Sequence, residues 1–531
     1  MTSHKFRQVG PALLLLTLLG FSVSCKKDKE EPAPEPEKAS RTELTADSIF
    51  LYAKEVYLWN ESLPDYNTFN PRKYATADEE GGFRQELFAI TRYAKDPATG
   101  QSYELDTDNP NGIKYSYITN TENANPVAAI ASRLSSVDLE GNGYDLGMDV
   151  GFYGVATSAD AYRIYVLDVS PNSPAAKAGI VRGDVIQSVN GRTLGANFTA
   201  EKSFLDDVFF SSTVSTAALT GTKRGGTPFN LTLTRSSYKS SPVHLDTVYT
   251  AGTKKIGYLV FSEFSTGSNA VARLNDSFSE FAAAGVTDLI VDLRYNGGGY
   301  VSTAEHLTNL IAPATVDGQV MFTERFNTLM QNKQAPILKN LPLLNDQDQI
   351  QYSGEKMLTY ADADYTIAGN TSKFSKKGNL RNLTNVVFIT TDGTASASEL
   401  VINNLKPHMN VKTVGETSYG KPVGFFPLRI DKYDVYMSMF ESRNSKGEGG
   451  YYFGIKPDAE AFDDPRYAFG DLGEESLATA YAYLVRGSFT SSLGAISSMN
   501  QSRGLKPKAL QHAGKSLSKG FKGMIEDRIR R

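Results

Sequence analysis

The chain has 531 residues, of which 40% are hydrophobic and 21% charged, so it can bury the cores of two to four domains. Its net charge of −4 excludes a protein built mainly to bind nucleic-acid phosphates, because no overall positive field exists to hold them. A single cysteine excludes a disulfide framework and cysteine-rich metal sites, and the five histidines show no metal-ligand spacing. We therefore expect no nucleic-acid partner, no bound metal and no cofactor.

The first forty residues have the features of a targeting segment. Residues 1–24 predict a lipoprotein signal peptide, with a basic start, a short apolar run and small residues before Cys25. Cys25 stands where a bacterial lipoprotein signal would place its lipidated residue, although a chance cysteine at the end of a signal peptide is the alternative. Residues 25–40 then form a charged tether. These features predict a lipid-anchored protein of the bacterial cell envelope, either in the outer membrane or facing the periplasm.

Residues 41–135 predict a small, mostly helical N-terminal domain. Apolar residues recur at spacings of three and four along 47–59, with Asp47 and Ser48 as candidate caps, and 83–93 suggests a second helix.

The chain changes character over residues 140–240, where short β-rich runs are divided by turn residues. Pro174 opens a short helix that Gly179 can close. The strand expected at 185–189 leads into Asn190-Gly191, a tight hairpin turn.

The stretch from Val169 to Gly191 resembles a PDZ domain of the bacterial protease type. Such domains bind an extended peptide as an added strand and hold its terminal carboxylate on backbone N–H groups. The resemblance implies a carboxylate loop ahead of the first core strand, and a structural β domain without a peptide ligand is the alternative. The candidate peptide-binding residues are Leu146, Gly147, Val150, Gly151 and Phe152.

Residues 241–485 alternate apolar strands with helical segments, which predicts an α/β core of β-α-β units. Strands are expected at 255–261, 288–293 and 386–390, and helices at 270–284 and from about 396. The polar stretch 313–384 yields no assignment.

Residues 486–531 predict a basic, flexible tail. From Arg503 onward there are nine lysines and arginines against Glu526 and Asp527. The tail is either solvated or in contact with anionic lipid or another envelope component.

Two stretches carry candidate chemistry. In D-L-I-V-D-L-R-Y-N-G-G-G-Y, from Asp288 to Tyr300, a buried strand runs into three glycines, which can expose N–H groups to a ligand. In T-T-D-G-T-A-S-A-S-E-L, a strand turns into a helix at Ser396, where free N–H groups can stabilise an oxyanion. The alternative is that Ser396 is only an N-cap, with Glu399 completing a capping box.

Lys421 is a candidate general base for that serine. A serine hydroxyl is a poor nucleophile without a base, and a lysine amine is a base only when it is neutral. Since the ordinary lysine pKa is about 10.4, the amine must be desolvated. The apolar Val423, Phe425 and Phe426 suit such burial, whereas a surface charge is the commoner fate of a lysine.

Together these stretches resemble the C-terminal processing peptidases, or tail-specific proteases. These serine peptidases have a PDZ domain ahead of, or within, an α/β core of the ClpP/crotonase type. The family motif D-L-R-x-N-x-G-G matches 292–299, S-A-S-E matches 396–399, and G-E-x-x-x-G-K ends at Lys421. The likeness extends to Y-S-Y-I at Tyr115 and G-I-K-P-D at Gly454.

The resemblance implies Ser396 as nucleophile and Lys421 as general base, with the spacing disfavouring Ser398. The N–H groups of Ala397 and Gly298 would form the oxyanion hole. The implied activity is that of a membrane-anchored serine endopeptidase that captures polypeptides by their C-terminal tails.

One position departs from the family. Many members carry a glutamine four residues after the lysine, where this chain has Phe425. The departure supports a second hypothesis, a catalytically inactive peptide-binding lipoprotein. A third is a Ser-His hydrolase that uses His306. The sequence gives no basis for predicting the oligomeric state.

Overall fold

The computed structural model describes most of the chain after the targeting segment. Cys25, residues 1–24, most of the tether and most of the basic tail lie outside the described residues. Among those described, no helix is both long enough and apolar enough to cross a membrane. The described residues are 38–107, 109–122, 137–155, 160–210, 214–343, 349–489 and 523–525.

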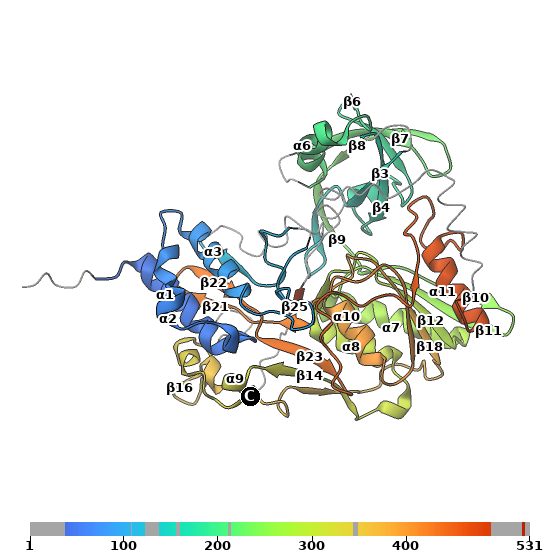
Figure 1. Ribbon diagram of the computed structural model, residues 1–531. Helices are drawn as coiled ribbons and strands as arrows, with labels where there is room; N and C mark the ends of the chain where they lie inside the picture. The colour runs from blue at the N-terminus through green and yellow to red at the C-terminus, as the bar shows by residue number, and fades with distance from the viewer. Residues whose placement is uncertain are drawn as a thin grey trace, which may run out of the picture. The chain divides into compact units, whose positions relative to one another are not determined.

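A six-stranded sheet forms the centre of the α/β core (Figure 1). Its order is β10 (Val243–Ala251), β11 (Lys254–Phe261), β12 (Asp288–Asp292), β18 (Asn385–Thr390), β19 (Asn410–Gly415) and β24 (Ala459–Glu460). Strands β11 to β24 are parallel and β10 pairs with β11 antiparallel. Helix α7 (Gly267–Ala284) connects β11 to β12, and α10 (Ala397–Leu405) connects β18 to β19. The predicted β-α-β core is confirmed.

The two faces of this sheet are covered by different helices because successive side chains point to opposite sides of a strand. Leu259, Leu289 and Phe388 belong to the larger hydrophobic cluster, which includes α7, α8 (Val301–Ile311) and α10. Their neighbours Tyr258 and Ile290 belong to a second cluster with α11 (Glu475–Arg486). The sheet is therefore buried on both faces, which explains its continuous apolar strands.

The stretch 313–384, which the sequence left unassigned, supplies part of a second sheet. Its order is β17 (Thr371–Lys373), β14 (Val320–Phe326), β23 (Phe440–Asn444) and β20 (Val423–Gly424). Other short elements are α2 (Tyr66–Phe69), α9 (Thr328–Gln331), β15 (Tyr352–Ser353), β16 (Lys356–Met357) and β21 (Leu428–Ile430).

The N-terminal region is helical as predicted, but its core is shared with the rest of the molecule. Helices α1 (Arg41–Val56) and α3 (Glu79–Thr91) contribute to the same hydrophobic cluster as the central sheet. Strand β1 (Tyr117–Asn120) pairs with β22 (Tyr433–Tyr436). The N-terminal segment and a segment more than 300 residues later thus build one core.

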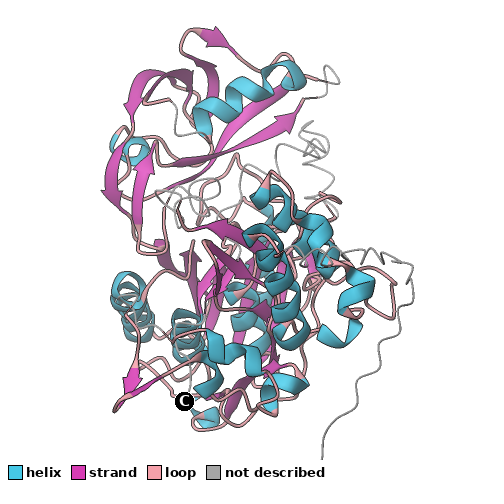
Figure 2. Cartoon of the chain, turned by 90° about the vertical axis from the view of Figure 1, so that its left-hand side faces the viewer, coloured by secondary structure: helices cyan, strands magenta, loops and turns pink. Residues whose placement is uncertain are grey.

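A separate β domain lies between these two parts of the sequence, so it is an insertion into the core. Its sheet has the order β3-β4-β5-β7-β8, with β6 added to β5, and it has its own hydrophobic cluster. Figure 2 shows its strands together with its helices. The domain's entry and exit are paired as β2 (Asn142–Asp145) and β9 (Ser236–Lys239). Its elements are β3 (Met148–Gly154), β4 (Tyr162–Val169), α5 (Pro174–Lys177), β5 (Val185–Val189), β6 (Arg192–Thr193), α6 (Phe198–Phe209), β7 (Thr216–Thr222) and β8 (Pro228–Thr234).

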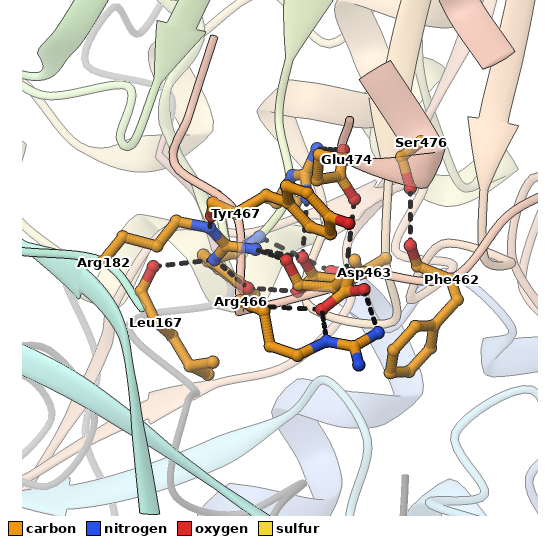
Figure 3. Close-up of polar contacts among 12 residues, drawn as sticks. Leu167, Arg182, Phe462, Asp463, Arg466, Tyr467, Glu474 and Ser476 are labelled. Atoms are coloured by element: carbon orange, nitrogen blue, oxygen red, sulfur yellow. Dashed lines mark hydrogen bonds and ion pairs between the residues drawn. The ribbon is translucent and has the colours of Figure 1, made fainter. Parts of the chain in front are cut away.

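A buried arginine of the β domain joins it to the core (Figure 3). Arg182 donates to Asp463 Oδ1 at 2.6 Å and to the carbonyls of Leu167 and Tyr467 at 2.7 and 3.0 Å. A further bond of 2.9 Å reaches the hydroxyl of Tyr295, which lies just before Gly297–Gly299, the glycine stretch. Asp463 also accepts from Arg294 of the D-L-R motif at 2.6 Å. The two buried arginines therefore share one carboxylate at the joint.

We predict that Arg182→Ala destabilises the protein. The change leaves the Leu167 and Tyr467 carbonyls without their buried donor, while Asp463 keeps Arg294. We expect a loss of about 3 kcal/mol in urea unfolding, near the lower end for breaking a buried ion pair. Arg192→Ala, at an exposed position of the same domain, is the control. Equal stability of the two variants would contradict a structural role for the joint.

Candidate active site

Three loops meet at one edge of the central sheet because they follow neighbouring parallel strands. The glycine stretch follows β12, Ser396 follows β18, and Lys421 follows β19. The carboxyl ends of parallel strands lie at the same edge, which is where open α/β sheets place their sites. The topology thus brings the two stretches singled out in the sequence next to the lysine loop.

Hydrogen bonds between the loops fix their spacing. Ala395 N–H donates to the carbonyl of Asn296 at 3.0 Å, and Tyr419 N–H donates to the carbonyl of Thr394 at 2.9 Å. The hydroxyl of Ser398 donates to the same Asn296 carbonyl at 3.0 Å and is fully buried. Ser398 therefore has a structural role, which agrees with its rejection as the nucleophile.

Ser396 has a backbone conformation that is rare for a residue with a side chain. Its φ is 59° and its ψ −111°, at the N-cap of α10. Such positions cost of the order of 1–3 kcal/mol and cluster at active sites. The side chain is fully buried, and its Oγ makes no hydrogen bond with any described residue, Lys421 included. Ala397 is the first residue of α10, so its N–H has no partner within the helix.

Glu399 connects the serine loop to the lysine loop. Its Oε2 accepts the N–H of Ser396 and the N–H of Lys421, both at 2.8 Å. Its Oε1 accepts the N–H of Gly420 at 2.7 Å and the hydroxyl of Ser418. Burial raises the pKa of this carboxyl, and the four hydrogen bonds oppose the rise. The capping-box interpretation thus describes the Ser396–Glu399 contact and misses the second loop.

Lys421 is buried, which excludes the surface-charge alternative. Its exposure is 2%, and desolvation lowers the pKa of its amine to about 7 against the opposing charges of Glu104 and Glu399. Nζ lies 4.6 Å from the centre of the Phe425 ring. Phe425, which stands where many family members have a glutamine, thus covers the amine with its ring. The absence of the glutamine therefore does not expose the lysine to water.

The N-terminal region completes the lysine pocket, and this contribution was missed in the sequence. The hydroxyl of Tyr115 donates to the carbonyl of Gly420, and Tyr117 packs edge-on against Phe425 with ring centres 5.5 Å apart. Glu104 is fully buried and accepts from Tyr57 Oη at 3.0 Å and Ser116 N–H at 2.9 Å. The likeness at Y-S-Y-I was a signal for the tyrosines, whereas no local pattern marks Glu104.

Two other predicted residues have partners of their own. The N–H of Gly298 donates to Asn296 Oδ1 at 3.0 Å, so it is engaged in this structure. His306 lies on α8, and its Nε2 pairs with Asn275 Oδ1 of α7 at 2.8 Å. Burial lowers the pKa of His306. Since Ser396 Oγ has no partner among the described residues, a Ser396–His306 pair is not formed.

The predicted peptide-binding residues of the β domain divide into two groups. Leu146 and Gly147 form a turn whose carbonyls accept from Ala175 N–H and Ser170 N–H, both at 3.0 Å. The other three, Val150, Gly151 and Phe152, lie in strand β3 rather than in a loop. The expected loop of 146–152 is therefore wrong in extent, because the first core strand already begins at Met148. Strand β3 is an edge strand of its sheet.

Comparisons with known proteins agree with this architecture. Residues 255–461 match Peptidase family S41, and residues 165–201 match a PDZ domain. A crystal structure of a putative S41 protease from Bacteroides fragilis is 21% identical and superposes with a TM-score of 0.54 over 86% of this chain and all of that one. At this identity the likeness establishes the fold.

Curated relatives include two C-terminal processing enzymes. The chain is 26% identical to the carboxy-terminal processing protease CtpA of Bacillus subtilis over 61% of its own length. It is also 26% identical to the chloroplastic C-terminal processing peptidase of Tetradesmus obliquus over 58%. The chain spans only 59% and 58% of the length of these relatives.

We predict that Glu399→Gln destabilises the site. The amide nitrogen cannot accept an N–H, so at least one of the buried donors that Glu399 now satisfies loses its acceptor. We expect a loss of about 3 kcal/mol in urea unfolding, since an unsatisfied buried polar group costs about 1–3 kcal/mol and two donors meet at each oxygen. The same change at Glu280, an exposed residue of α7, is the control. A Glu399→Gln protein as stable as this control would contradict the bridging role.

Proposed function

We propose that the chain is a serine endopeptidase of the C-terminal processing type, because residues 255–461 match Peptidase family S41 and residues 165–201 match a PDZ domain. Ser396 is the nucleophile and Lys421 the general base. The observation that carries the proposal is the Glu399 carboxylate, which binds the backbone of both residues through one oxygen. The strained Ser396 and the desolvated Lys421 support the same assignment.

The reaction proceeds by acyl transfer. Neutral Lys421 takes the proton of Ser396 Oγ as this oxygen attacks the scissile carbonyl, and the ammonium then protonates the leaving amine. Water then hydrolyses the ester: Lys421 takes a proton from the water and returns it to Ser396 Oγ. The Ser396–Lys421 hydrogen bond forms when substrate binds, as such contacts often do. The N–H of Ala397 stabilises the oxyanion, and that of Gly298 joins it after releasing Asn296 Oδ1.

Polypeptide tails are the proposed substrates. A PDZ domain binds an extended peptide by strand addition, and β3, directly after the Leu146–Gly147 turn, has one edge that no other described strand pairs with. The recognition is therefore assigned to this edge and turn, and the chemistry to the core. The names of the curated relatives support the same substrate class.

We further propose that Cys25 carries lipid and anchors the enzyme in the bacterial cell envelope. The support is the position of the chain's only cysteine directly after a signal-like apolar run. The charged tether would then hold the enzyme away from the membrane surface.

Turnover of an unfolded protein tests the assignment of the nucleophile. Ser396→Ala should remove activity, and His306→Ala should retain it, because His306 contacts α7 rather than the serine. The measurement is release of peptides from a denatured substrate by folded variants. Activity retained in Ser396→Ala would refute the serine mechanism, and activity lost in His306→Ala would favour the Ser-His alternative.

The pH dependence of activity tests the base. Lys421 must be neutral to accept a proton and is charged below its pKa of about 7, so kcat/KM should fall about tenfold per pH unit below pH 7. Lys421→Ala and Lys421→Arg should both lose on the order of 10³-fold, since guanidinium does not deprotonate. A folded Lys421→Ala enzyme with normal turnover would exclude the dyad.

A second variant is needed because a histidine base would titrate in nearly the same range. The Phe425 ring favours the charged amine, so Phe425→Leu should lower the lysine pKa further and move the acid limb to lower pH. The shift should be roughly 0.4 to 0.7 of a pH unit, from about 0.5–1 kcal/mol of cation–π energy. An acid limb that stays in place in Phe425→Leu, together with loss of activity in His306→Gln, would identify the histidine as the base.

Cys25→Ser tests the anchor. Without the thiol no lipid can be attached, so the variant should move from the membrane fraction to the soluble fraction. The measurement is fractionation of cells in high salt, which also releases electrostatically bound protein. A variant that stays with the membrane would contradict the lipoprotein assignment.

A further inference from the structure

The end of the chain pairs with the glycine stretch of the candidate active site. Strand β25 (Gly523–Ile525) is parallel to β13 (Gly298–Tyr300), with Gly298 opposite Gly523, Gly299 opposite Met524 and Tyr300 opposite Ile525. The two strands form a sheet of their own, drawn near the middle of Figure 1. A segment of the basic tail therefore reaches the loop that holds the proposed oxyanion donor.

The same segment also borders the lysine loop. Strand β25 lies beside β20 (Val423–Gly424), which begins two residues after Lys421. Helix α10, which begins next to Ser396, lies against β13. The backbone of 523–525 is thus placed between the strand of the glycine stretch and the strand that follows the general base.

Strand β13 has one edge that is already occupied and one that can receive a further strand. The first edge is occupied by Phe264, whose N–H donates to the carbonyl of Gly298 at 2.9 Å and whose carbonyl accepts the N–H of Tyr300 at 2.8 Å. Gly299 has a φ of 134°, and a Cβ at this position would lie 2.1 Å from the Phe264 carbonyl oxygen. Only glycine permits this packing, which leaves one edge of β13 open for a single extended strand.

We propose that β13 is the strand to which a substrate adds and that the chain's own C-terminal segment around Gly523–Ile525 is a substrate of Ser396. This proposal rests on the proposed peptidase function. Ser396 Oγ forms an ester with the carbonyl carbon of a peptide bond within or beside 523–525, and the C–N bond breaks. The amine takes the proton held by Lys421, and water then frees the new C-terminus.

The connection within one chain is long enough for this reaction. Residues 490–522 separate β25 from the last described residue of the core, Phe489, and at about 3.3 Å per residue they can span on the order of 100 Å. A tethered segment competes at an effective concentration of up to about millimolar. The uncut tail therefore inhibits other substrates, and its removal activates the enzyme.

Intact-mass measurements on the purified full-length chain test the proposal. Wild type should lose a C-terminal fragment cut within or beside Gly523–Ile525, at a rate independent of protein concentration, and Ser396→Ala should keep its full mass. Met524→Pro removes a backbone donor from β25 and should slow the loss at least tenfold. Ser516→Pro, outside β25, is the matched control and should be cut at the wild-type rate.

Turnover of a denatured protein by the same wild-type sample separates the two proposals. If wild type degrades this substrate but keeps its own full mass, self-cleavage is refuted while the peptidase function stands. If it does neither, both proposals fail. A fragment lost faster at higher protein concentration, or equally fast in Met524→Pro and Ser516→Pro, also overturns cleavage of the strand-bound tail within one chain.

Discussion

The candidate site depends on one carboxylate oxygen that accepts hydrogen bonds from two backbone N–H groups. Glu399 Oε2 holds Ser396 from the end of one strand and Lys421 from the end of the next. Because both contacts are made to the backbone, the positions of the two residues are fixed before their side chains are considered. The bond to Ser396 also helps to hold a φ that the residue would otherwise avoid.

The lysine pocket balances opposing demands on one amine. Desolvation favours the neutral form, whereas the carboxylates of Glu104 and Glu399 and the face of Phe425 favour the charged form. The result is an amine whose pKa is lowered only to about 7, so it still binds a proton below that pH. A phenyl ring at position 425 serves a different purpose from an amide, since it excludes water and offers no hydrogen bond.

Features with local signals could be predicted from the sequence. The strand Val185–Val189 has the expected bounds, because the turn formed by Asn190 and Gly191 fixes its end. The serine, the lysine and the glycine stretch follow from motifs of a few residues. Glu104 and the second sheet do not, because Glu104 acts on Lys421 in a distant part of the chain and β14 pairs with β23 across more than a hundred residues. The predicted loop extended too far, because the glycine within Met148 to Phe152 favours a loop when the sequence is considered alone, whereas these residues begin strand β3.

The pairing of distant segments around the lysine has a consequence for biosynthesis. The hydroxyl of Tyr115 binds the carbonyl of Gly420, 305 residues later in the chain, and β1 pairs with β22. Contacts between residues this far apart in sequence form late in folding, because the entropy cost of closing the intervening chain must first be overcome. Lys421 is therefore desolvated only after the segments on both sides of the PDZ domain have come together. Under the proposed mechanism, a nascent chain therefore has its serine but no neutral lysine to activate it, and it can act as a protease only after it has folded.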